Sequence, residues 1–207
     1  MKDTWILFVR HGETDWNIQK RMQGQTEIPL NQNGLQQAEK VGNQLKEYPI
    51  DVMYSSPQIR ALTTAKAIHK NHARIPIYTH EALKERSFGA LEGKTFDDLH
   101  KMPFLNFTTS WGFAHYKPPG GERIFDVQTR TKKFLDSMLI EHKGKTIAIV
   151  SHGVTIRCMI CYLTKIPIEH NMFFELGNTS LSIIKKSGDE EAQLQVINNI
   201  THLNENV

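Results

Sequence analysis

The chain has 207 residues, of which 39% are hydrophobic and 23% are charged, a balance typical of a protein with a packed core. A formal net charge of +3 is too small to indicate nucleic-acid binding, and no apolar run is long enough to cross a bilayer. The N-terminus lacks the long apolar stretch of a secretion signal, so we expect a cytoplasmic protein that contacts neither nucleic acid nor a membrane.

The first half of the chain alternates between strand and helix patterns. Thr4–Arg10 is a short apolar run that ends before a glycine, which predicts a buried strand. After Asn31–Gly34, apolar residues at helical spacing predict a helix with the inner face Leu35, Ala38, Val41 and Leu45. Asp51–Ser56 is the next predicted strand.

A second helix is expected directly after that strand. Ser56 would cap this helix, and Pro57 would occupy its first position. The predicted inner face consists of Ile59, Leu62, Ala65 and Ile68. A third strand is predicted at Ile75–Thr79.

An irregular stretch then interrupts the alternation. Residues 88–116 are rich in aromatic side chains and lack a clear period, so we interpret about 88–117 as an insertion over the site, within a single domain of residues 1–207. A helix, a strand, a helix and two strands are expected to follow: Glu122–Glu141, Thr146–Ser151, Val154–Leu163, Leu181–Lys185 and Gln193–Ile200. This order predicts an α/β fold, a three-layer α/β/α sandwich with a mainly parallel central sheet. Two cysteines, Cys158 and Cys161, lie inside the last predicted helix, where we interpret them as core packing.

Two predicted strands end in the same way. Arg10, His11 and Gly12 follow the first strand, and Ser151, His152 and Gly153 end the strand that begins at Thr146. The carboxyl ends of parallel strands share one edge of a sheet, so both histidines are expected at that edge, where ligands bind. Gly153 also begins a helix, whose N-terminal amides favour an anion.

Arg60 lies one turn into the helix that follows the second strand, so its side chain is expected at the same edge. Alone, Arg60 is better interpreted as a solvated helix residue, and a lone histidine at a strand end as a structural residue. Together, Arg10, His11, Arg60 and His152 form a cationic cluster. Because arginine matches phosphate oxygens with parallel hydrogen bonds, the cluster indicates a phosphate site.

The motifs around these residues resemble those of the histidine phosphatase superfamily, which includes cofactor-dependent phosphoglycerate mutases. The resemblance spans about residues 4–160 in order, and its motifs are Arg10-His11-Gly12-Glu13-Thr14, Trp16-Asn17, Arg21-Met22-Gln23-Gly24, Leu30-Asn31-Gln32-Asn33-Gly34, Ser55-Ser56-Pro57 with Arg60, Glu85-Arg86-Ser87-Phe88-Gly89 and Ser151-His152-Gly153. An isolated Arg-His-Gly triplet would indicate little, but this ordered set is specific.

The resemblance implies a role for each candidate residue. His11 would be the nucleophile and form a phosphohistidine, while Arg10, Arg60 and His152 would hold the phosphoryl oxygens. Further hydrogen bonds to the phosphate would come from Asn17, Gln23, Gly24 and Gly153. The resemblance implies neither a metal nor a cofactor, because the positive charge comes from side chains.

Glu85 resembles the proton donor to the leaving oxygen, which later accepts a proton from water. Without the resemblance, a surface carboxylate paired with Arg86 is the simpler interpretation. Glu13 belongs to the first motif and is expected to orient a site arginine rather than to react. Glu122 is either near the site or a carboxylate attracted to a helix start.

The sequence favours the phosphatase branch over a mutase. In the mutase branch, a lysine and paired arginines contact the substrate carboxylate, but residues 95–116 contain no adjacent arginine pair. This stretch is instead aromatic: Phe96, Phe104, Phe107, Trp111, Phe113 and Tyr116. The rings either line the leaving-group pocket or form a small core of their own.

The expected function is therefore hydrolysis of a phosphomonoester, with a small phosphorylated metabolite as the partner. Phosphoglycerate mutase activity is the first alternative, and a non-catalytic phosphoester-binding module is the second. The sequence leaves a homodimer open.

Overall fold

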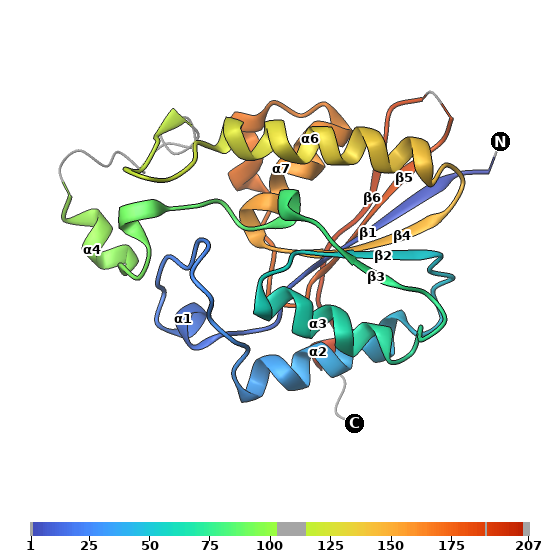
Figure 1. The fold of residues 1–207 in the computed structure, drawn as a ribbon, viewed down its shortest axis with the longest axis horizontal. Helices are drawn as coiled ribbons and strands as arrows, with labels where there is room; N and C mark the ends of the chain where they lie inside the picture. The colour runs from blue at the N-terminus through green and yellow to red at the C-terminus, as the bar shows by residue number, and fades with distance from the viewer. Residues whose placement is uncertain (1, 103–114, 189, 205–207) are drawn as a thin grey trace.

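The computed structural model describes residues 2–102, 115–188 and 190–204, which build a central sheet (Figure 1). Its strand order is β3-β2-β4-β1-β5-β6. The strands are β1 Thr4–Arg10, β2 Val52–Ser55, β3 Ile77–Thr79, β4 Thr146–Ser151, β5 Leu181–Lys186 and β6 Gln193–Asn199. Strands β1 to β4 are parallel, whereas β5 and β6 add antiparallel strands at one edge. The predicted mainly parallel sheet is confirmed.

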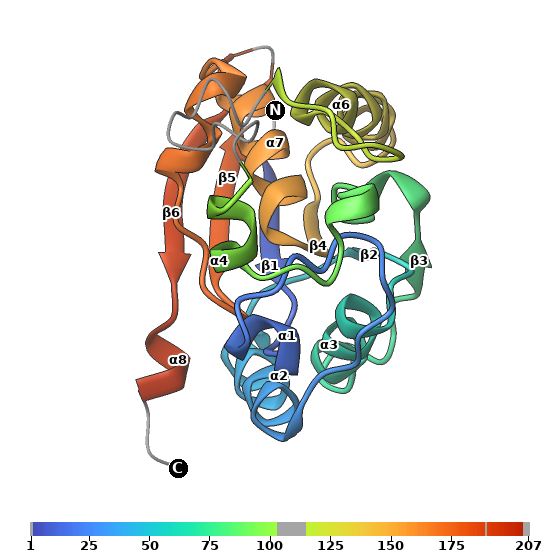
Figure 2. The ribbon, with the colours of Figure 1, turned by 90° about the vertical axis from the view of Figure 1, so that its left-hand side faces the viewer.

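Helices cover both faces of the sheet (Figure 2). Helices α2 (Gln32–Leu45) and α3 (Ile59–His69) lie on one face, and α6 (Ile124–Glu141) and α7 (Gly153–Thr164) lie on the other. Alternate residues of β1 and β4 point to opposite faces, as the period of a strand requires. One set, which includes Ile6 and Ile147, packs with α6 and α7. The other, which includes Leu7 and Ala148, packs with α2 and α3. The three-layer α/β/α prediction is confirmed.

Shorter elements surround the carboxyl ends of the parallel strands. They are α1 Asp15–Ile18, η1 Glu81–Leu83, η2 Gly89–Leu91, α4 Phe96–His100, η3 Ile168–Phe173 and the C-terminal α8 Thr201–Asn204. Helices α1 and α4 lie beyond the end of the sheet where β1 finishes (Figure 1). Of the aromatic residues assigned to the insertion, Phe104, Phe107, Trp111 and Phe113 lie outside the described residues.

The predicted start and inner face of α3 were partly wrong. The helix begins at Ile59 with Gln58 as its N-cap, and no side chain caps it. Ser56 is instead turned toward the site, where it bonds to His152. Ile59 is 46% exposed while Arg60 is fully buried, so the inward face is rotated toward Arg60. Of the predicted face, Ala65 and Ile68 are fully buried.

Helix α2 differs from its prediction at one position, because Leu35 is 41% exposed while the neighbouring Gly34 is buried. A Cβ on Gly34 would lie 2.0 Å from the carbonyl oxygen of Glu13. The helix therefore approaches the segment after β1 through a residue without a side chain. Cys158 and Cys161 are buried in the core, as predicted, and burial raises the pKa of both thiols.

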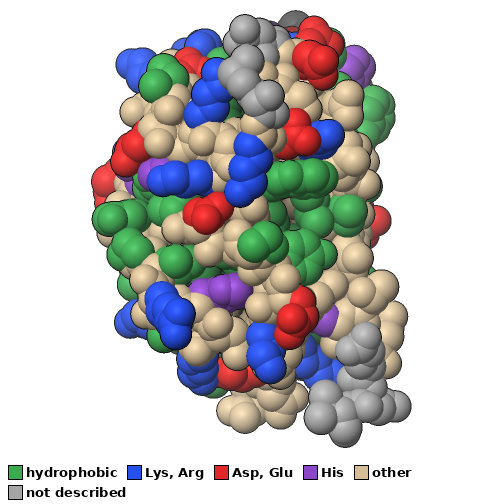
Figure 3. Space-filling model, turned by 90° about the vertical axis from the view of Figure 1, so that its right-hand side faces the viewer, with side chains coloured by type: hydrophobic (Ala, Val, Ile, Leu, Met, Phe, Trp, Pro, Cys, Tyr) green, Lys and Arg blue, Asp and Glu red, His purple; other side chains and the backbone are tan. Residues whose placement is uncertain are grey.

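The end of the molecule that faces away from α1 and α4 carries acidic and basic side chains interspersed with hydrophobic ones (Figure 3). This mixture agrees with the small net charge and differs from the single-sign surface of a typical nucleic-acid binder. Within the described ranges, every helix is too short or too polar to cross a membrane.

Candidate active site

The pairing of β1 with β4 brings the two histidines together. Arg10 and Ser151 are register partners at the carboxyl ends of these strands, so His11 and His152 follow at adjacent positions. Their ring centroids are 5.2 Å apart, and both side chains are buried. The shared edge of two parallel strands thus places two imidazoles at one point.

Of the two ring nitrogens of His11, Nδ1 is hydrogen-bonded, whereas Nε2 has no hydrogen bond to the described residues. Its Nδ1 lies 2.7 Å from the carbonyl oxygen of Gly12, which can only accept, so Nδ1 carries the proton of the neutral ring. Burial, and then the charges of Arg60 and Arg10, hold the pKa of His11 well below its ordinary value of 6.5. At neutral pH, Nε2 therefore presents a lone pair.

Arg10 and Arg60 supply buried positive charge around that nitrogen. Nη1 of Arg10 donates to the carbonyl oxygen of Leu176 at 2.5 Å. Nη1 and Nη2 of Arg60 donate to the carbonyl oxygens of Thr26 and Gly24 at 2.9 and 2.7 Å. Burial lowers the pKa of Arg10 to about 10, so this group is still a cation at neutral pH.

His152 lies behind the cavity lining, with its ring centroid 5.2 Å from that of His11, and it is absent from the residues that line the cavity itself. Its Nε2 lies 2.8 Å from Oγ of Ser56. That hydroxyl also accepts from the amide of Gln58, which leaves its hydrogen for Nε2 and places the His152 proton on Nδ1. Burial and the charge of Arg60 hold the pKa of His152 well below 6.5, so its ring is neutral too.

Three of these side chains carry buried N–H groups without a partner. Nε of Arg10, Nε of Arg60 and Nδ1 of His152 accept or donate no hydrogen bond within the described part of the chain. Each unsatisfied buried donor costs about 1–3 kcal/mol. An oxyanion that accepts from all three would offset that cost, which suits a phosphoryl group.

Glu85 is a buried carboxylate rather than a surface one, so the simpler interpretation of this residue was wrong. It is 8% exposed and lines the same cavity as His11. Its oxygens accept from the amides of Arg86 (2.8 Å), Thr155 (3.1 Å) and Val154 (3.2 Å). Two of these are the second and third amides of α7, so the carboxylate of Glu85 occupies donors of the helix N-terminus that the sequence analysis assigns to an anion. Gly153, the first residue of the helix, lines the cavity.

Asn17, Gln23 and Gly24 also line this cavity. Oδ1 of Asn17 accepts from the amide of Thr14 at 3.1 Å and from Nδ2 of Asn178 at 3.3 Å, so its own Nδ2 is left to donate. Gln23 is buried. Gly24 has a φ of +54°, and its carbonyl oxygen accepts from Nη2 of Arg60.

One other expectation was wrong, and one of the two alternatives for Glu122 can now be described. Glu13 does not orient an arginine, because its Oε1 accepts from Asn31 and Asn33, both at 3.0 Å. Glu122 accepts from the amide of Ser87 at 2.8 Å and pairs with Arg130 at 2.9 Å. Glu122 therefore supports the loop that carries Glu85.

The structure adds residues that the sequence reasoning missed. Gln58, fully buried, accepts from the amide of Glu85 at 2.8 Å and donates to Gly24 at 3.2 Å. Nδ2 of Asn178 donates to the carbonyl oxygen of His11 at 3.1 Å. Asn178 lies far from the motifs, and its only sequence signal is its place before the strand that begins at Leu181.

The cavity has a volume of about 620 Å³ and extends well beyond His11. Its outer part has an apolar wall formed by Trp16, Met22, Phe88, Phe96, Leu99 and Val154. Additional basic side chains line it, namely Lys20, Arg21, His100 and Arg157. A phosphate bound at His11 would occupy only one end of this space.

A parallel α/β/α sandwich with two histidines and two arginines at one sheet edge defines a class of phosphoryl-transfer proteins. The family model of the histidine phosphatase superfamily (branch 1) matches residues 6–200, and the chain belongs to this superfamily.

Relatives with different names match nearly the whole length of the chain. The chain is 34% identical to Bacillus stearothermophilus YhfR, with a TM-score of 0.87 over 97% of this chain and 99% of that one. It is 32% identical to phosphoserine phosphatase from Entamoeba histolytica, with a TM-score of 0.86 over the same shares. It is also 31% identical to phosphoglycerate mutase-like protein 4 from Arabidopsis thaliana, over 97% of this chain and 87% of the relative.

Proposed function

We propose that this protein is a phosphomonoester hydrolase in which His11 carries the phosphoryl group between two displacements. The observation that carries the proposal is the buried ring of His11, whose Nε2 holds a lone pair at a cavity that also contains buried N–H donors. A neutral nitrogen is a nucleophile, and fixed donors stabilise the charge that develops on the phosphoryl oxygens.

In the first displacement, Nε2 of His11 attacks phosphorus while the ester P–O bond breaks. Arg10, Arg60 and Nδ1 of His152 donate to the non-bridging oxygens. Glu85, protonated at this stage, gives its proton to the leaving oxygen, so the alcohol departs neutral.

In the second displacement, water attacks the phosphohistidine. The Glu85 carboxylate takes a proton from this water, the N–P bond breaks, and phosphate departs. His11 returns to its starting tautomer because Nδ1 keeps its hydrogen bond to Gly12 throughout. In this proposal His11 is the covalent catalyst, and Glu85 is the general acid and then the general base.

The covalent intermediate can be trapped with an aryl phosphate in the presence of a chelator. Because p-nitrophenolate leaves without an acid, Glu85→Gln should form the phosphohistidine but hydrolyse it slowly. We expect a burst of nitrophenol and an alkali-stable labelled phosphoryl group on His11. His11→Ala should show neither. A wild-type protein that binds phosphate without turnover would instead support a binding module.

The mutase-like relative from Arabidopsis makes isomerisation of phosphoglycerate the second candidate. The test is 3-phosphoglycerate with catalytic bisphosphoglycerate, with release of phosphate and formation of 2-phosphoglycerate both followed. We expect phosphate release to dominate. Isomerisation that exceeds hydrolysis would favour the mutase.

A small phosphorylated metabolite is the proposed substrate. The phosphoserine phosphatase from Entamoeba histolytica has been solved with phosphoserine and with 3-phosphoglyceric acid. A cavity of about 620 Å³ accommodates molecules of this size.

A further inference from the structure

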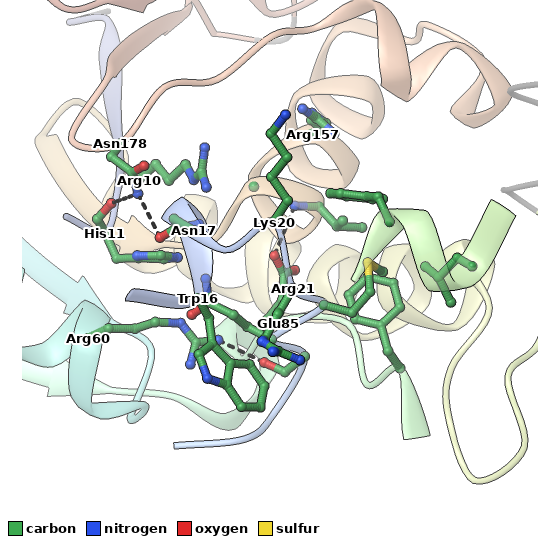
Figure 4. A pocket seen from close by; sticks show the side chains of 18 of the residues that line it. Arg10, His11, Trp16, Asn17, Lys20, Arg21, Arg60, Glu85, Arg157 and Asn178 are labelled. Carbon is green, nitrogen blue, oxygen red and sulfur yellow. Dashed lines mark hydrogen bonds between the residues drawn. The ribbon is translucent and has the colours of Figure 1, made fainter. Parts of the chain in front are cut away.

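The outer end of the cavity holds two cations that the proposed chemistry does not use. Lys20 follows α1 and Arg157 lies in the second turn of α7, and both line the cavity. Figure 4 shows the Lys20 side chain extending toward Arg157, on the side of the cavity away from Arg60.

Arg157 is held in place but not neutralised. Its Nε donates to the carbonyl oxygen of Phe174 at 2.7 Å, and Nη1 lies 3.6 Å from the sulfur of Met172. Nη2 makes no hydrogen bond within the described residues. The carboxylates that act on Arg157 are those of Glu85 and Glu175, and neither forms an ion pair with it among the described side chains.

Lys20 is held by its backbone, while its ammonium group has no partner. Its amide donates to Asn17 and its carbonyl oxygen accepts from Phe96, both at 3.1 Å, in a left-handed conformation with φ 52°. In the described part of the chain, Nζ makes neither a hydrogen bond nor an ion pair. The neighbouring Arg21 differs, because its guanidinium donates to Gln19 and Gly93.

The protein itself offers little negative charge to this pair. The oxygens of Glu85 already accept from backbone amides. A solvated lysine alone needs no partner, but a lysine and an anchored arginine that line one cavity together make its potential positive, which favours an anion there.

We propose that Lys20 and Arg157 form a second anion site, which binds a carboxylate or a second phosphate on the leaving group. The inference rests on the proposed function, because the ester phosphate must lie at His11. The substrates are then phosphomonoesters of small alcohols that carry another acidic group, with their carbon atoms against the apolar wall.

Matched pairs of esters test this site. Phosphoserine differs from phosphoethanolamine only by its carboxylate, and glycerol 1,3-bisphosphate differs from glycerol 1-phosphate only by its second phosphate. For the wild type we expect kcat/KM to be about tenfold higher for the anionic member of at least one pair, the value of one charge-assisted hydrogen bond. The pair that shows the preference identifies the second anion.

The variants are Lys20→Met and Arg157→Gln, with the exposed Lys46→Met and Arg74→Gln as matched controls. Each cavity variant should lower the preference within the responsive pair about fivefold or more. The controls should keep it. An unchanged preference, or equal losses for both members of each pair, would overturn the second anion site.

A binding measurement distinguishes failure of the second anion site from failure of the proposed hydrolase function. In a His11→Ala background, calorimetry with the same esters needs no turnover, and Lys20→Met should weaken binding of the anionic member selectively. A wild type that hydrolyses no ester would refute the hydrolase, whereas hydrolysis without selectivity would refute only Lys20 and Arg157.

Discussion

The hydrogen bond from Nδ1 of His11 to Gly12 decides which ring nitrogen can react. Because the acceptor is the next carbonyl oxygen along the same chain, the tautomer is set locally and survives changes elsewhere in the cavity. The cations have a different task. Together with burial, which is the larger cause, they lower the pKa of His11 and so leave Nε2 unprotonated at pH values where a free histidine would be largely protonated.

We predict that Arg60→Met raises the pKa of His11. The charge of Arg60 disfavours the imidazolium, so its removal stabilises the protonated form; the rise will be partial, since burial is the larger cause. Titration of the His11 ring by NMR measures this change, with Arg74→Met as a distant control. An unaltered His11 pKa in Arg60→Met would contradict the electrostatic argument.

At the scale of elements, Glu85 and α7 stabilise each other. The carboxylate accepts from the amides of Val154 and Thr155, which lack partners inside the helix. The same bonds hold Glu85 in the cavity that His11 also lines. A residue proposed to move protons thus also serves as an anchor for a helix terminus.

Gly34 gives a prediction at this scale. Alanine in place of a helical glycine usually stabilises a protein by up to about 1 kcal/mol. Here the added Cβ would lie 2.0 Å from the Glu13 carbonyl oxygen, so we expect Gly34→Ala to lower the free energy of unfolding by about 2 kcal/mol or more and to reduce activity.

Urea unfolding measures the free energy of unfolding of Gly34→Ala. Leu35→Ala, at an exposed position of the same helix, is the control. A Gly34→Ala protein as stable as the wild type would contradict this prediction, because the segment after β1 would then move to accommodate the Cβ without a loss of stability.

The sequence predicted strands and helices well where the apolar period is strong, as in β1, β4 and α7. It misjudged α3, because a buried arginine cannot be told from a solvated one by hydropathy. Antiparallel pairing of β5 with β1 depends on contacts across the chain. For the same reason Gln58 and Asn178 were missed, since their hydrogen bonds join segments far apart in sequence.

At the scale of the whole molecule, buried neutral histidines couple stability to pH. The pKa values of His11 and His152 lie well below 6.5, and burial lowers that of His202 to about 4. The unfolded chain binds these protons more readily. The stability from neutral histidines is therefore complete above about pH 6.5 and is lost progressively as pH falls toward 4.

We expect the free energy of unfolding, measured in urea, to fall between pH 7.5 and pH 5. His202 bonds to Thr179, beside the Asn178 that contacts His11, so it reports on both the C-terminal helix and the site. His202→Gln should give a shallower pH dependence. A wild type equally stable at both pH values would refute the linkage.

The residues proposed to hold the phosphoryl group come from the ends of β1 and β4 and the first turn of α3, whereas most of the apolar wall comes from the short helices α1 and α4 and the loops near them. The residues proposed to react with the phosphoryl group and the residues that contact the alcohol are thus in different parts of the chain. Mutational libraries confined to Met22, Phe96 and Leu99 should therefore retarget the protein to new alcohols while the reacting histidine keeps its surroundings.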